Sequence, residues 1–100
     1  MFYSHDDEYF NFERTPVMST YLIAFIVSDF KSGNTTDNFH AWAREGAITQ
    51  VNYSVNVGPF LLKAMEEFLD LKYLMPKMDV VAVPDFSAGA MENWGLTTYR

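Results

Sequence analysis

The sequence has 100 residues, of which 49% are apolar and 17% aromatic, and its formal net charge is -6. Its seven basic residues are scattered rather than clustered, which argues against nucleic acid as a partner. It contains no cysteine, and this excludes disulfide scaffolds, thiolate metal sites and cysteine nucleophiles. So high an apolar share in so short a chain predicts that part of this surface packs against segments outside these residues.

The first eleven residues mix aromatic side chains with one histidine and three carboxylates, a composition typical of a surface loop. These four side chains could hold a metal ion, but their spacing fixes no ligand geometry. We therefore interpret them as part of a solvated loop. The four residues are His5, Asp6, Asp7 and Glu8.

An apolar run, Tyr21 to Val27, is rich in β-branched and aromatic residues. It predicts a strand over residues 19–28 that is buried on both faces. The run is too short to cross a bilayer, and no basic leader precedes it. The polar residues between Asp29 and Asn38 then predict a turn that reverses the chain.

Alternation of side chains predicts a second strand from Asn38 to Arg44. Apolar residues at 39, 41 and 43 would share one face of a half-buried sheet, and residues 40, 42 and 44 the other. This places His40 on a sheet face, and we interpret it as structural rather than catalytic. At Gly46 the period of the pattern changes.

Apolar residues recur at three- and four-residue steps from Ile48 to Leu71, and they predict an amphipathic helix. Pro59 lies inside this pattern and should kink the helix or divide it in two. A strand over 78–83, ended by Pro84, a loop over 85–90 and an extended segment over 94–99 complete the predicted elements.

The loop that follows the 78–83 strand carries the residues most suggestive of chemistry. Gly89 and Ala90 would let a ligand approach the backbone closely, so that main-chain groups could pair with an extended peptide. Glu92, next to Trp94, could meet a positive charge in a charge-assisted hydrogen bond. The alternative is a structural glutamate at a strand edge, which the physical argument by itself favours.

The five residues Gly89-Ala90-Met91-Glu92-Asn93, followed by Trp94-Gly95, resemble the signature of the aminopeptidase N family of zinc exopeptidases. Residues 12–22 and 74–77 are also similar to segments of that family. The resemblance implies that Glu92 binds the α-amino group of a peptide substrate and that the backbone at Gly89 and Ala90 lines the peptide path. It implies a substrate-binding role for all five residues. Ala90 favours the peptidase branch over the leukotriene hydrolase branch.

The resemblance also implies a fold. It predicts an α+β fragment, in which the last strands of a β-sandwich-like domain are followed by the opening helix and strands of a thermolysin-like catalytic domain. Residues 1–44 would be the C-terminal part of the N-terminal β domain, and residues 45–100 the N-terminal part of the catalytic domain. The change of period near Gly46 agrees with this boundary.

The zinc site of the family is a His-Glu-x-x-His helix with a further glutamate, and this sequence does not contain it. The two histidines are His5 and His40, and the residues four positions later are Tyr9 and Arg44. We therefore expect no zinc ligand and no catalytic residue within the chain. Zn²⁺ would belong to the full-length parent enzyme, and the piece alone would be inactive.

The expected partners are peptides with a free N-terminus, and nucleic acid is not expected. The resemblance places the parent at the plasma membrane or the extracellular face, with anchoring through sequence outside this chain; a cytosolic location is the alternative. Two sequons, at Asn34 and Asn52, would permit glycosylation there. An alternative function is a non-catalytic ectodomain or binding module recognised by a protein partner. The sequence leaves oligomeric state and the preferred substrate side chain open.

Overall fold

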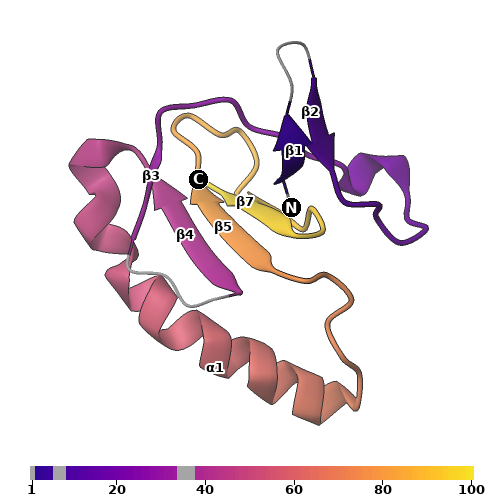
Figure 1. Cartoon of the computed structure of the whole chain (residues 1–100). Coiled ribbons are helices and arrows are strands. Elements are labelled where there is room, and N and C mark those ends of the chain that lie inside the picture. The colour runs from indigo at the N-terminus through magenta and orange to yellow at the C-terminus, as the bar shows by residue number, and fades with distance from the viewer. Residues whose placement is uncertain (1, 6–8, 34–37) are drawn as a thin grey trace.

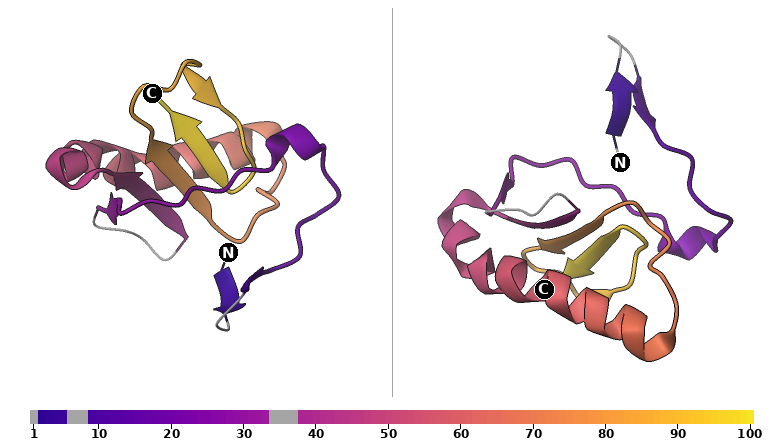
Figure 2. Two further views of the ribbon diagram at one scale, coloured as in Figure 1. Left: turned by 90° about the horizontal axis from the view of Figure 1, so that it is seen from above. Right: turned by 60° about the horizontal axis from the view of Figure 1, so that its bottom comes forward.

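The computed structural model describes residues 2–5, 9–33 and 38–100. The chain begins with a two-stranded antiparallel ribbon of β1 (Phe2–His5) and β2 (Phe10–Phe12). In Figures 1 and 2 this ribbon stands to one side of the larger sheet. The sequence was expected to form a loop here, and that prediction was wrong for these two segments. Residues 6–8 lie outside the described residues, as does the side chain of His5, so the carboxylate and histidine cluster is not described.

The main sheet has five strands in the order β3-β4-β5-β7-β6. The inner pairs β4–β5 and β5–β7 are parallel, whereas β3–β4 and β6–β7 are antiparallel. Together with one long helix, this mixed sheet makes an α+β fold. The strands are β3 (Lys31–Ser32), β4 (Phe39–Ala43), β5 (Met78–Ala82), β6 (Ala90–Met91) and β7 (Leu96–Tyr99).

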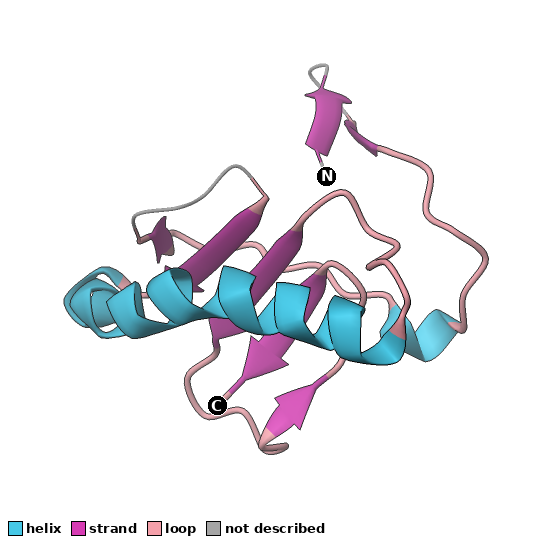
Figure 3. Ribbon diagram, turned by 90° about the horizontal axis from the view of Figure 1, so that it is seen from below, coloured by secondary structure: helices cyan, strands magenta, loops and turns pink. Residues whose placement is uncertain are grey.

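The long helix α1 (Asn52–Leu69) connects the parallel strands β4 and β5, because parallel neighbours need a crossover connection. A 3-10 helix, η2 (Glu45–Val51), leads into it. Figure 3 shows α1 running across the strands on one face of the sheet. The core lies between them, where Ala41 and Ala43 of β4 pack with Val51 and Val55.

The predicted strand over residues 38–44 is confirmed. Phe39, Ala41 and Ala43 are buried, and His40 and Trp42 on the opposite face are half-buried. The predicted helix over 48–71 is confirmed in type but is shorter, because its first turns are the 3-10 helix η2. The helix is not divided at Pro59, since α1 continues through that residue as one element. The strands expected near 78–83 and 94–99 are β5 and β7.

The predicted strand over residues 19–28 is wrong. The structure has a short 3-10 helix, η1 (Thr20–Leu22), followed by residues without regular structure. Leu22 is buried, but Phe25 is 82% and Val27 93% exposed. A β-forming composition becomes a strand only when a neighbouring strand accepts its hydrogen bonds, and none in the described part of the chain pairs with this run.

One face of α1 is also apolar and exposed. Phe60, Leu61, Met65 and Phe68 are each more than half exposed. Such a face is typical of a helix that packs against further protein. Among the described residues, no helix has both the length and the apolar character needed to cross a bilayer.

The sheet extends across the domain boundary expected at residue 44. β4, which precedes this boundary, pairs with β5, which follows it, through four residue pairs from Phe39↔Met78 to Trp42↔Val81. β3 joins the same sheet through β4. The division into domains stays a prediction, and so do the β-sandwich-like and thermolysin-like assignments.

Candidate functional site

Residues 89–95 lie at the edge of the sheet, where β6 ends and the chain turns into β7. β6 is the outermost strand, and it pairs only with β7 among the described strands. Gly89, Ala90 and Glu92 are exposed, Met91 is half-buried, and Asn93 is only 6% exposed. The turn thus presents Glu92 to solvent next to a buried residue.

The side chain of Asn93 fixes this turn from inside. Its Nδ2 donates to the carbonyl oxygen of Tyr21 at 3.4 Å, and its Oδ1 accepts from the hydroxyl of Thr98 at 3.4 Å. Its carbonyl accepts from the amide of Leu96 at 3.2 Å, which closes the turn. Because buried polar groups need partners, these bonds define where the neighbouring Glu92 stands.

The open edge of β6 has a defined pattern of free backbone groups. The amide of Arg100 donates to the carbonyl of Gly89 at 3.0 Å, so the pair 89–100 is hydrogen-bonded. Bonded and non-bonded pairs alternate in an antiparallel ladder, which makes the next pair, Ala90↔Tyr99, a non-bonded one. Consistently, the carbonyl of Tyr99 turns the other way and accepts from Val83 at 2.7 Å. The N–H and C=O of Ala90 therefore face away from β7.

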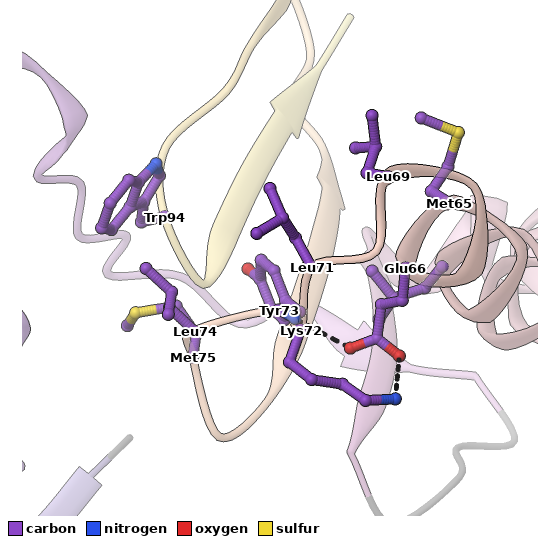
Figure 4. Close-up of a pocket in the computed structure, with 10 residues that line it drawn as sticks. Met65, Glu66, Leu69, Leu71, Lys72, Tyr73, Leu74, Met75 and Trp94 are labelled. Atoms are coloured by element: carbon purple, nitrogen blue, oxygen red, sulfur yellow. Dashed lines mark hydrogen bonds and ion pairs between the residues drawn. The ribbon is translucent and has the colours of Figure 1, made fainter.

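The side chain of Glu92 has no hydrogen bond or ion pair with any other residue among those described. It lines neither of two hollows found in this part of the chain. One, of about 260 Å³, is an apolar hollow between the end of α1, the 71–75 segment and Trp94 (Figure 4). The other, of about 770 Å³, lies on the sheet face that carries His40 and Trp42.

The smaller hollow has one acidic group at its margin. Glu66 Oε1 accepts from the amide of Tyr73 at 2.8 Å, and Glu66 Oε2 lies 3.5 Å from Lys72 Nζ (Figure 4). The Tyr73 amide bond is the main cause that holds the pKa of Glu66 below its ordinary value; partial burial opposes it and Lys72 supports it. This contact ties the 71–75 segment to α1.

Comparison with known proteins identifies the family. Residues 53–100 match the model of the peptidase family M1 domain. The chain is 45% identical over 94 residues to endoplasmic reticulum aminopeptidase 1 of Mus musculus, covering 90% of this chain and 10% of that protein. It is 50% identical over 95 residues to aminopeptidase N of Canis lupus familiaris (89% and 10%), and 44% identical over 93 residues to aminopeptidase N of Haemonchus contortus (89% and 10%).

The chain belongs to peptidase family M1. It spans about a tenth of the length of the curated M1 relatives that it matches. The resemblance to aminopeptidase N, recognised from residues 89–95, is thereby confirmed at the level of the family. The matched M1 region contains α1 apart from its first residue, together with β5, β6 and β7, and so includes residues 89–95.

No three His, Cys, Asp or Glu side chains come together as a set of metal ligands in the described part of this M1 segment. The acidic residue of the motif, Glu92, is therefore not part of such a set. The described residues do not form a donor set for zinc.

Sequence reasoning missed a second set of residues, which holds the turn after the motif. Gly95 has a φ of 77° and is buried, and both of its backbone polar groups are bonded to residues that precede β5 or begin it. The side chains involved are Tyr73, Lys77 and Asp79. The sequence did contain a signal for this set of residues. Lys77 and Asp79 are charged residues at the start of an otherwise apolar strand.

Proposed function

We propose that this chain is the amine-recognising segment of a zinc-dependent M1 aminopeptidase, which hydrolyses N-terminal residues from peptides. In this proposal Glu92 binds the α-ammonium group of the substrate. The observation that carries it is the exposed side chain of Glu92, which lies in the chain between an edge strand and the buried Asn93, in a chain that belongs to family M1. The names of the relatives, aminopeptidase N and endoplasmic reticulum aminopeptidase 1, support the activity.

The chemistry of recognition follows from charge. A carboxylate and an ammonium group form a hydrogen bond that is shorter and stronger than a neutral one. Once a peptide covers the site, a substrate without a free amine would leave Glu92 desolvated and unpaired, which is unfavourable. The same group that attracts a free N-terminus therefore disfavours internal peptide segments, and this is the selectivity of an exopeptidase.

The edge of β6 provides a place for the peptide backbone. The N–H and C=O of Ala90 face away from β7, so an extended peptide could pair with them as an added strand. Gly89 contributes a position where a Cβ would meet nothing within 4 Å. In this arrangement Gly89, Ala90 and Met91 line the path of the peptide, and Asn93 keeps Glu92 in place at its end.

Zinc would be held by sequence outside these residues, because the described part of the chain offers no donor set. When bound in the full-length enzyme, Zn²⁺ would supply the activated water that attacks the peptide bond. The contribution of this chain is to bind and orient the substrate's amino end. We extend the proposal to peptides as the partner class and to the plasma membrane or extracellular face as the location.

The test uses the full-length M1 protein that carries this segment. Glu92→Gln removes the charge but keeps the shape, and kcat/KM for an amino-acid 4-nitroanilide should fall about 10- to 150-fold, since a hydrogen bond to a charged group contributes about 1.5–3 kcal/mol. Glu67→Gln, at an exposed position of α1, is the matched control and should retain full activity. If Glu92→Gln retains the activity and selectivity of the wild type, the assignment is wrong and a non-catalytic binding role becomes the better account.

A further inference from the structure

The residue that ends the candidate motif is held through both of its backbone polar groups. The amide of Gly95 donates to the hydroxyl of Tyr73 at 3.0 Å. Its carbonyl accepts from Lys77 Nζ at 2.6 Å and from the amide of Asp79 at 3.1 Å. Because Gly95 stands at a φ of 77°, a conformation that favours glycine, this turn has a single defined geometry.

Lys77 is itself fixed by a chain of charged contacts. Its Nζ donates to Asp79 Oδ2 at 2.6 Å, and Asp79 Oδ1 lies 2.7 Å from His40 Nδ1. The side chains of Lys77 and Asp79 are only 15% and 14% exposed. A lysine with two partners in such a place has little freedom, so it holds the carbonyl of Gly95 in a defined position. The contacts link β4 through β5 to the turn.

Tyr73 is fixed in a similar way from the other side. Its amide donates to Glu66 at the end of α1, and Figure 4 shows its ring lying between α1 and the turn that carries Trp94. Burial raises the pKa of the Tyr73 hydroxyl, as does the nearby Asp79, although the bond from Gly95 opposes them. The phenol therefore stays neutral at physiological pH and remains a suitable partner for the Gly95 amide.

We propose that Tyr73, Lys77 and Asp79 are positioning residues for amine recognition, and that they act by clamping Gly95 and thereby setting the place of Glu92. This inference rests on the proposed function of Glu92. Glu92 lies three residues before Gly95, and its own carboxylate has no bond within the described residues that would hold it. Small misplacements of a binding group can cost about 100-fold in rate, so a carboxylate on an exposed turn needs support of this kind.

Tyr73, Lys77 and Asp79, which together form a clamp on Gly95, differ from ordinary core packing because their side chains are polar or charged. Replacing a largely buried ion pair by apolar side chains of similar volume is often neutral or favourable for stability. Here Lys77 bonds to the carbonyl oxygen of Gly95, Asp79 bonds to Lys77, and His40 bonds to Asp79. Such an arrangement fixes a hydrogen-bonded position in a way that apolar packing does not.

The experiment compares two inhibitors of the full-length protein, alanine hydroxamate and propionohydroxamate, which differ only in the α-amino group. The inhibition constant of propionohydroxamate divided by that of alanine hydroxamate measures how much the α-amino group contributes to binding. This ratio is independent of contacts that both inhibitors share. Lys77→Met should reduce this ratio at least tenfold and leave propionohydroxamate binding unchanged. Tyr73→Phe, which removes one hydroxyl, should reduce it about 3- to 10-fold. Lys77→Arg, which keeps the charge and the donor, should recover most of the ratio.

A double-mutant cycle then shows whether the clamp acts through Glu92. In the Glu92→Gln background, Lys77→Met should have almost no further effect on the ratio, because the group that it positions is already neutral. Lys63→Met, an exposed lysine of α1, is the control and should not change the ratio in either background.

Two results would overturn the inference in different ways. If Lys77→Met and Tyr73→Phe lower the melting temperature but leave the ratio unchanged, the clamp is purely structural and Glu92 keeps its assigned role. If Glu92→Gln itself leaves the ratio unchanged, the proposed function fails and the positioning role fails with it.

Discussion

Gly58 of α1 lies directly against the ring of Phe39 in β4. A Cβ atom at position 58 would overlap this ring, with Phe39 Cε1 and Cε2 only 2.6 and 2.7 Å away. This contact brings the middle of α1 close to the buried face of β4. Absence of a side chain, rather than a special backbone conformation, is what the position requires.

Gly58→Ala should therefore destabilise the packing of α1 on the sheet. We expect the free energy of opening of α1, measured by hydrogen exchange, to fall by about 1–3 kcal/mol, the range typical of an overpacked core. Gly46→Ala is the control, because a Cβ there meets nothing within 4 Å. Adding Phe39→Leu to Gly58→Ala should restore part of the loss, and additive effects of the two changes would contradict the contact.

Gly95→Ala should disturb the turn that carries the candidate motif. An L-residue at a φ of 77° costs about 1–2 kcal/mol, and the new Cβ would also stand 3.3 Å from Met75 Cε. We expect faster exchange of the Leu96 amide, which donates to Asn93, together with a lower kcat/KM. Gly95→Asn should be milder, since asparagine tolerates this region better. Equal effects of alanine and asparagine would argue against backbone strain as the cause.

Protonation of Glu66 should loosen the segment that follows α1. The pKa of Glu66 is lower in the folded chain than its ordinary value of 4.5, mainly because of the Tyr73 amide bond. The folded state therefore favours the ionised form, so the stabilisation is present above this value and is lost as pH falls through the lowered pKa. Hydrogen exchange over residues 70–75, corrected for intrinsic rates, should show less protection in acid.

The control for this effect is Glu66→Gln, which should lose the extra dependence on pH over residues 70–75. Lys72→Met should retain most of it, because Lys72 is a smaller cause of the pKa shift than the Tyr73 amide. A pH dependence that is the same in wild type and Glu66→Gln would show that another group controls this segment.

Ala90→Pro should reduce peptide binding with little effect on the sheet. The N–H of Ala90 faces the open edge, so proline removes a donor that β7 does not use. In the full-length protein we expect a higher KM for peptides and a smaller change for an amino-acid 4-nitroanilide, which has less backbone to pair. Thr98→Pro, in β7 next to the buried turn, is the comparison and should unfold the edge of the sheet. An Ala90→Pro variant with wild-type KM for peptides would exclude strand addition at this edge.

The sequence predicted those parts of the fold that depend on local pattern. The strand of Phe39, Ala41 and Ala43 was predicted with the correct buried face, because alternation along a strand is a local property. The helix was predicted from its three- and four-residue period, β5 as a strand ended by Pro84, and β7 as an extended segment. The apolar run from Tyr21 to Val27 was assigned wrongly, since strand formation needs a partner that composition does not reveal.

The sequence by itself determined the family, through Gly89 to Asn93, and it placed Glu92 as the group to consider for recognition of an amine. The residues of such a short motif are consecutive in the chain, so the motif can be recognised without a structure. Only the tertiary structure showed that Tyr73, Lys77 and Asp79 meet at Gly95, between 16 and 22 residues away from it in the chain. Hydrogen bonds between such distant residues depend on which strands become neighbours, and that order is set by the whole sheet.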